Sequence, residues 1–124
     1  ATRQKTLSGA NILLLGIAYK PEVDDDRESP AYALWKLLMG AGARIDYHDP
    51  HIPVIRPSRE HAEFAGKTRI ELTAESVSSY DLVLLVTHHR DLDYAMVARS
   101  AALLVDTRNA FAQQNIPSDR YFKA

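Results

Sequence analysis

Short apolar runs alternate with segments of helical period along this chain. The runs at Asn11–Leu15, Leu82–Val86 and Ala102–Val105 are nearly unbroken, which is typical of strands buried on both faces of a sheet. Arg44–His48 predicts a further short strand, closed by the Asp-Pro dipeptide that follows it. These four segments are the candidate strands of one sheet.

The clearest helix is predicted over residues 30–42. Ser29 is a preferred N-cap residue and Pro30 suits the first helical position. Gly40 and Gly42 mark the C-terminal end. Apolar residues recur on one face of this segment, at Ala31, Leu34, Trp35, Leu38 and Ala41. The tryptophan of this stripe is expected in the core.

The other segments have weaker patterns. Residues 51–66 carry two prolines and predict an irregular excursion, whose charged part is expected to be solvated. A short strand is predicted at Thr68–Leu72, a short helix capped by Thr73 at 73–80, a helix at Asp91–Arg99, and no clear period from Asn109 onward. Strands alternating with helices imply right-handed crossovers and parallel pairing. We therefore expect an α/β fold, a Rossmann-like three-layer sandwich with a mainly parallel sheet.

Length and composition narrow the class of protein. A chain of 124 residues is the size of one domain, here 1–124 with a core at about 11–111. The net charge of −1 argues against nucleic-acid binding, and no apolar run is long enough for a membrane span. There is no cysteine, which excludes disulfides, thiolate zinc sites and cysteine catalysis and is compatible with a cytoplasmic protein. The start without Met indicates a processed or excised fragment or a cloning product.

The loop after the first strand carries the candidate chemistry. It begins GIAYKP, so only Gly16 of a G-x-G-x-x-G fingerprint is present, and the standard NAD-binding turn is not expected. Phosphate contacts would come from side chains instead. Lys20 supplies a compact cation, Arg27 a planar fork, and Tyr19 a ring or a hydroxyl, next to a helix N-terminus at Pro30.

The same loop has a plainer interpretation as a solvated acidic surface. Five acids oppose an anion, and some are expected to orient Arg27 or to cap helices: Glu22, Asp24, Asp25, Asp26 and Glu28. A metal site is not expected, because the EF-hand spacing and its glycine are missing. The histidines at 88 and 89 are also a poor chelating pair, since neighbouring strand residues point to opposite faces. Asp49 is expected in a turn or cap.

The segment 16–30, G-x-A-Y-K-P-x-V-D-D-x-R-E-S-P, resembles the signature that opens the C-terminal domain of the UDP-glucose/GDP-mannose dehydrogenase family. The similarity covers about residues 11–111, through Gly42-Ala43, Tyr47-His48-Asp49-Pro50 with Ile52-Pro53, Thr87, and Val105-Asp106-Thr107-Arg108-Asn109. The segment Arg56–His61 looks most like the branch that acts on UDP-N-acetylglucosamine and similar UDP-N-acetylhexosamines.

The resemblance implies a function for the domain. Enzymes of this family oxidise C6 of a UDP-sugar to a carboxylate with two NAD and no metal, for polysaccharide or lipopolysaccharide synthesis. They carry an N-terminal NAD-binding domain and a central dimerisation domain, which this chain lacks, and their catalytic cysteine lies upstream. The chain would then be the UDP-binding part of a homo-oligomeric dehydrogenase, inactive alone, with the UDP-sugar and its own missing domains as partners.

The resemblance also assigns residues. Tyr19, Lys20 and Arg108 match substrate-contacting positions, and Arg27 matches a position that reaches toward NAD; no catalytic residue is expected in this part. Asp106 and Asn109 would orient Arg108 or shape its turn.

Two other interpretations remain open. One is a receiver-like phosphoacceptor domain, disfavoured because the acids lie far beyond Gly16 and the last strand lacks a following lysine. The other is a partner-binding domain with a dead site.

Overall fold

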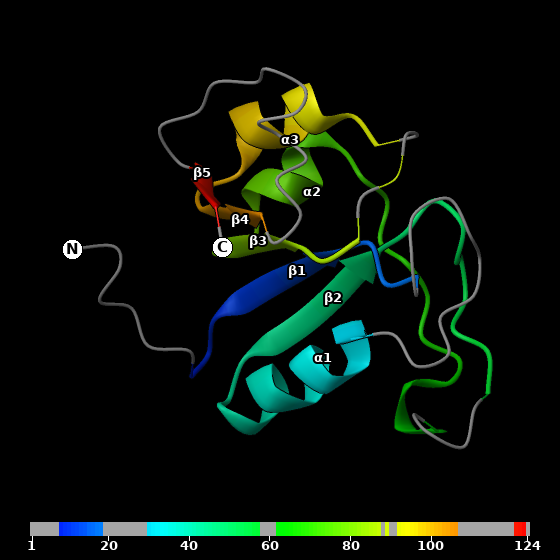
Figure 1. Ribbon diagram of the computed structural model, residues 1–124. Helices are drawn as coiled ribbons and strands as arrows, with labels where there is room; N and C mark the ends of the chain where they lie inside the picture. The colour runs from blue at the N-terminus through cyan, green and yellow to red at the C-terminus, as the bar shows by residue number, and fades with distance from the viewer. Residues whose placement is uncertain are drawn as a thin grey trace.

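The described part of the chain folds as a five-stranded parallel sheet covered by helices on both faces (Figure 1). The computed structural model describes residues 8–18, 30–57, 62–87, 89 and 92–106 and the backbone of 121–123. The elements are β1 (Asn11–Leu15), α1 (Pro30–Gly40), β2 (Arg44–His48), η2 (Ala62–Phe64), α2 (Ala74–Ser78), β3 (Leu82–Leu85), α3 (Tyr94–Ser100), β4 (Leu104–Asp106) and β5 (Tyr121–Lys123). The predicted three-layer α/β architecture is confirmed.

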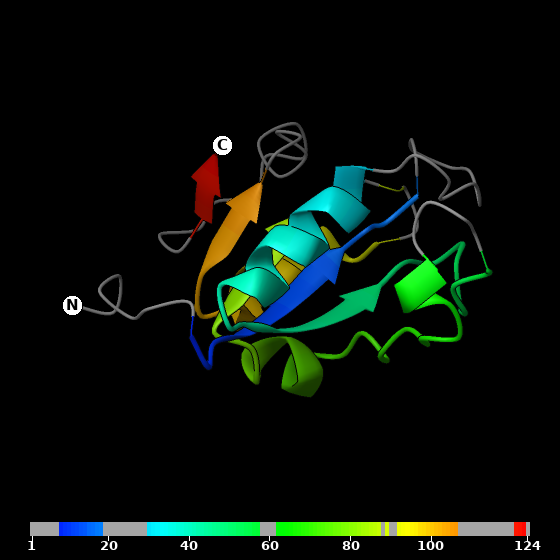
Figure 2. The ribbon, with the colours of Figure 1, turned by 90° about the horizontal axis from the view of Figure 1, so that it is seen from below.

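The two faces of β1 show why three layers form. Successive strand residues point to opposite faces, so Ile12 and Leu14 pack in the cluster that contains α1, whereas Leu13 and Leu15 pack in the cluster that contains α2 and α3. All four side chains have no exposed surface. Figures 1 and 2 show α1 on one face of the sheet and α2 and α3 on the other. An unbroken apolar run is the sequence that such a strand requires.

The strand order β2-β1-β3-β4-β5 places a topological switch point between β1 and β3. After β1 the chain turns to one side and forms β2, and it then crosses to the other side to form β3. The register aligns His48, Leu15, Leu85 and Asp106 across neighbouring strands, so the carboxyl ends of four strands are level. In open α/β sheets ligands bind beyond this edge, at the switch point.

Helix α1 begins at the predicted Pro30 and ends earlier than predicted, at Gly40. Gly42 has a φ of +95°, its amide donates to the Met39 carbonyl, and the Ala43 amide donates to the Leu38 carbonyl. These bonds form a Schellman motif, which ends a helix. The predicted stripe is buried or half-buried except for its last member, Ala41, which lies beyond the helix and is exposed.

The excursion after β2 contributes Phe64 to the core, although the charged region that contains this residue was expected to be solvated. Phe64 is 1% exposed, and its ring lies 4.6 Å from that of Trp35. The charged neighbours Glu63 and Lys67 remain exposed, as expected.

The predicted strand at Thr68–Leu72 is wrong: within the described chain it makes one isolated bridge, from Thr68 to Val54. Its backbone bonds instead go to several partners, which prevents a ladder.

The remaining boundaries depend on caps and long-range pairing. Thr73 and Ser76 form a capping box at the start of α2, so the predicted cap is confirmed. Helix α3 begins at Tyr94 because the Asp93 side chain accepts from the Met96 amide. Strand β4 lies two residues later than predicted at its start. Strand β5, in the tail that has no clear period, pairs parallel with β4 and was not predicted.

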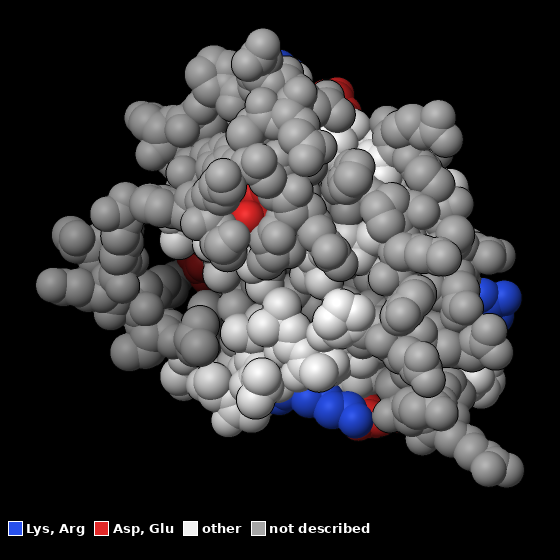
Figure 3. All heavy atoms as spheres, viewed as in Figure 1, with Lys and Arg blue, Asp and Glu red and all other residues white. Residues whose placement is uncertain are grey.

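The described surface over α1 carries few charges on the face shown in Figure 3. Leu37 is 72% exposed and Met39 is 48% exposed on this helix. Among the residues that the structure describes, no helix has the length and apolar character needed to cross a membrane.

Candidate functional site

The start of the loop after β1 is held at the switch point by its own backbone. The Gly16 amide donates to the His48 carbonyl over 2.8 Å, at the end of β2. Gly16 has a φ of +82°, and a Cβ there would lie 1.9 Å from the carbonyl oxygen of Thr87, after β3. Only glycine combines this φ with so close a backbone approach. The single glycine of the predicted loop therefore brings the ends of β1, β2 and β3 together.

A buried carboxylate beneath this loop accepts from its backbone. Asp49 follows β2 and has no exposed surface. Its Oδ2 accepts from the amides of Ile17 and Ala18 over 2.8 and 2.9 Å. Its Oδ1 accepts from the His51 amide over 2.8 Å. The expectation of a turn or cap is correct for His51 but incomplete, because the main partners lie in another loop.

His89 and Thr87 complete the buried cluster from the β3 side. His89 Nε2 lies 3.0 Å from Asp49 Oδ2. Since an ionised carboxylate only accepts, this nitrogen carries the proton. Thr87 Oγ1 donates to the Ala18 carbonyl over 2.8 Å. Tyr94 supports His89 because its hydroxyl accepts from the His89 amide and donates to the His89 carbonyl, both over 2.8 Å.

Two pKa values at this edge are lowered. Burial alone would raise the pKa of Asp49, but hydrogen bonds from His89 and from the His51 and Ile17 amides outweigh it, and the net shift is downward. Asp49 is therefore ionised at neutral pH. Burial lowers the pKa of His48, partly offset by its Ile70 hydrogen bond. The neutral His48 donates from Nδ1 to the Ile70 carbonyl over 2.8 Å.

Acid is expected to destabilise the domain through His48. In the folded state the pKa of His48 lies below its ordinary value of 6.5. Between the folded-state pKa and the unfolded-state pKa, the unfolded chain binds more protons than the folded protein, so the free energy of unfolding falls as the pH falls. Urea unfolding should show a smaller loss of free energy on acidification in His48→Gln than in the parent, within the window just below about pH 6.5. An equal loss in both proteins would show that His48 makes no such contribution.

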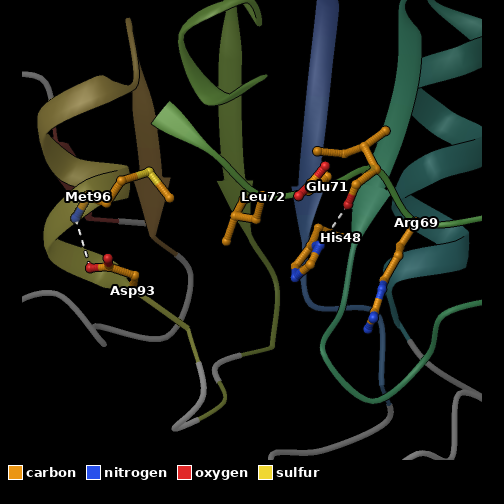
Figure 4. Close-up of a pocket in the computed structure, with 7 residues that line it drawn as sticks. His48, Arg69, Glu71, Leu72, Asp93 and Met96 are labelled. Carbon is orange, nitrogen blue, oxygen red and sulfur yellow. Dashed lines mark hydrogen bonds between the residues drawn. The ribbon is translucent and has the colours of Figure 1, made fainter. Parts of the chain in front are cut away.

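A pocket of about 580 Å³ opens beside the cluster, between the end of β2 and the start of α3. Figure 4 shows His48, Glu71 and Arg69 on the β2 side, Asp93 and Met96 on the α3 side, and Leu72 between them. Arg69 donates from one terminal nitrogen to the carbonyls of Asp49 and Pro50. Arg69, in the wall of the pocket, is thus hydrogen-bonded to the backbone of Asp49, whose side chain accepts from the loop amides.

The structure does not describe the predicted site residues. Tyr19, Lys20, Arg27 and Arg108 lie outside the described residues, as do His61, His88 and the acidic residues 22–28. Ala18, directly before Tyr19, is buried at the switch point, and Asp106, two residues before Arg108, is buried at the end of β4. Among the described residues no group of three side chains is arranged to hold a metal ion.

Asp49, Thr87 and His89 were not predicted as one cluster. The available signal was their position, because Asp49 and Thr87 follow directly after predicted strands, His89 lies three residues beyond the second of these strands, and parallel strands bring their carboxyl ends to one edge. Their residue types alone did not predict the cluster, since Asp and His occur both in buried hydrogen-bonded pairs and in ordinary surface turns.

Comparison with known proteins identifies a family that matches most of this chain. Residues 13–113 match the UDP-glucose/GDP-mannose dehydrogenase family, UDP binding domain. The UDP-glucose 6-dehydrogenase of Rhizobium meliloti is 30% identical over 115 residues, which cover 89% of this chain and 25% of that protein. The UDP-glucose 6-dehydrogenase of Pseudomonas aeruginosa is 33% identical over 111 residues, covering 84% and 24%. This chain thus spans about a quarter of the length of these relatives.

A solved structure agrees with this match. The UDP-glucose dehydrogenase of the hyperthermophilic archaeon Pyrobaculum islandicum superposes with a TM-score of 0.70 at 26% identity, over 97% of this chain and 26% of that one. The matched residues contain the last three residues of β1, all of β2, β3 and β4, and every residue of the buried cluster. The chain belongs to the UDP-glucose/GDP-mannose dehydrogenase family and is its UDP-binding domain.

Proposed function

We propose that this domain binds the nucleotide part of a UDP-sugar through side chains of the loop after β1, within an NAD-dependent UDP-sugar 6-dehydrogenase. The observation that supports it most is the anchoring of Gly16–Ala18 at the switch point between β1 and β3. Tyr19 and Lys20 come next in the sequence. A loop that leaves this edge starts where ligands of open α/β sheets bind.

The proposed roles follow the chemistry of the side chains. Lys20 and Arg108 offset the charge of the diphosphate, and Tyr19 orients the nucleotide. Arg27 reaches the NAD side when the other domains of the protein are present. The domain contributes binding and orientation, and the oxidation steps belong to residues elsewhere in the enzyme. The family match does not favour the receiver-like alternative.

The proposal extends to the whole enzyme. Its substrate is a UDP-N-acetylhexosamine, which rests on the sequence of Arg56–His61, and its product is a UDP-uronic acid for polysaccharide or lipopolysaccharide synthesis. It works in the cytoplasm as a homo-oligomer, and this part alone is inactive. Rates of NAD reduction by the full-length enzyme with UDP-N-acetylglucosamine and with UDP-glucose would decide which sugar is preferred.

Lys20→Ala is expected to weaken UDP binding by about tenfold or more, since a charge-assisted contact contributes about 1.5–3 kcal/mol. Calorimetric titration of the 124-residue chain with UDP measures the dissociation constant. Lys36→Ala is the matched control: it also removes one positive charge, on α1, where Lys36 pairs with Glu63 on the surface. Parent-like UDP affinity in Lys20→Ala would contradict the proposed role of Lys20.

A further inference from the structure

Three backbone amides and one carbonyl at the start of the loop have partners within the protein. The Gly16 amide donates to the His48 carbonyl, and the next two amides, of Ile17 and Ala18, donate to one oxygen of Asp49. The Ala18 carbonyl accepts from Thr87 Oγ1. Successive backbone amides that converge on one point form an anion site. Here the anion is a side chain of the protein itself.

This arrangement replaces the usual phosphate contact of such folds. In a dinucleotide-binding turn, amides after the first strand face the ligand pyrophosphate. In this chain the amides of Ile17 and Ala18 face the Asp49 carboxylate, which has no exposed surface. A ligand phosphate therefore has no access to these two amides, and its binding groups must come from elsewhere, in the proposed function from Lys20 and Arg108.

We propose that Asp49 is a positioning residue, which occupies the amides of Ile17 and Ala18 as an internal anion and, together with Thr87, holds the loop so that its side chains bind the ligand phosphate. This inference rests on the proposed function for the identity of the ligand. Asp49 and Thr87 do not touch the nucleotide; they act through the backbone of Ala18, next to Tyr19 and Lys20. His89 holds the carboxylate in this orientation through Nε2.

The geometry argues for positioning beyond ordinary core stability. A carboxylate without exposed surface is costly unless every oxygen is paired, and an apolar residue would avoid that cost. Asp49 accepts three backbone amides and the His89 ring nitrogen, and two of those amides belong to one loop. Thr87 adds a bond to the same loop from a different strand. Two independent elements thus constrain one short backbone segment.

The test uses Thr87, where two substitutions separate packing from hydrogen bonding. Thr87→Val keeps the shape and loses the donor to Ala18, whereas Thr87→Ser keeps the donor and loses a methyl group. We expect UDP to bind about fivefold more weakly to Thr87→Val, as expected for one lost hydrogen bond, and within about twofold of the parent to Thr87→Ser. A role in packing alone would give the opposite order.

Amide hydrogen exchange tests Asp49 without any ligand. In Asp49→Asn, exchange at Ile17 and Ala18 should accelerate more than exchange at Leu14 in β1, because only the loop anchor is weakened. Equal acceleration at the three amides, or unchanged UDP affinity in a folded Asp49→Asn, would overturn the positioning role. Thr87→Val should show the same selective acceleration at Ala18, so the inference can be judged even where Asp49→Asn does not fold.

The two proposals fail in different ways. A parent chain that does not bind UDP would contradict the proposed function of this chain, while hydrogen exchange would still decide whether Asp49 holds the loop. A parent that binds UDP, with Asp49→Asn and Thr87→Val binding it equally well, would leave the proposed function standing and overturn the positioning role.

Discussion

Replacing Gly16 by alanine is expected to lower the free energy of unfolding by about 2–5 kcal/mol, the sum of left-handed backbone strain and overpacking. The new Cβ would lie 1.9 Å from the Thr87 carbonyl oxygen and 2.8 Å from its carbon. These are backbone atoms of a buried residue just after β3, so they cannot rotate away as the end of a side chain would. Urea unfolding followed by circular dichroism measures the loss.

Gly9→Ala is the matched control for Gly16→Ala. Gly9 has a φ of +79°, close to the +82° of Gly16, and a Cβ there meets no atom within 4 Å. This substitution should therefore cost only the backbone strain, about 1–2 kcal/mol. Equal losses in the two variants would show that strain alone explains the effect and that the contact with Thr87 is loose enough to relax.

Trp35→Ala is expected to destabilise the domain by about 3–5 kcal/mol, the usual cost of removing a large aromatic residue from a core. Trp35 is 1% exposed. Its ring lies 4.6 Å from Phe64, 6.0 Å from Tyr47 and 6.4 Å from Tyr32, measured between ring centroids. It therefore joins α1, β2 and the excursion that contains η2, and its removal opens a cavity among all three.

Leu37→Ala tests whether that loss depends on burial. Leu37 lies on the same helix, two residues after Trp35, and is 72% exposed. Its substitution should change the free energy of unfolding by no more than about 0.5 kcal/mol. Thermal or urea unfolding compares both variants with the parent. A loss below about 1 kcal/mol for Trp35→Ala would mean that the aromatic cluster contributes little to stability.

Local sequence signals predicted the central part of the fold. Strand β1 was predicted with its observed ends because an unbroken apolar run is suited to a strand with helices on both faces. Helix α1 was predicted from its apolar stripe, and only its last two residues were wrong. The predictions failed where a segment needs a partner that is distant in the sequence. The predicted strand at 68–72 forms one isolated bridge, and β5, which was not predicted, has three residues and pairs only with β4 among the described strands.

In the candidate site, too, the local features were predicted from the sequence and the long-range contacts were not. The sequence directed attention to the loop after β1, because a lone glycine followed by Tyr19 and Lys20 after an apolar strand is a local pattern. It did not reveal what holds that loop. The Asp49 carboxylate bonds amides 31 and 32 residues away in the chain, and Thr87 bonds Ala18 across 69 residues. A composition of one Asp, one His and one Thr carries no information about such distances.

The sequence by itself determined the approximate positions of β1 to β4, the apolar stripe of α1 and the loop that carries the candidate phosphate contacts. These depend on backbone propensity and on apolar spacing within a few residues. Only the tertiary structure decided that Gly16 must pass within contact of Thr87, that Asp49 serves the loop as an internal anion, and that Phe64 closes the core over Trp35. Each of these depends on which distant segments share one edge or one face, and that follows from the packing of the whole sheet.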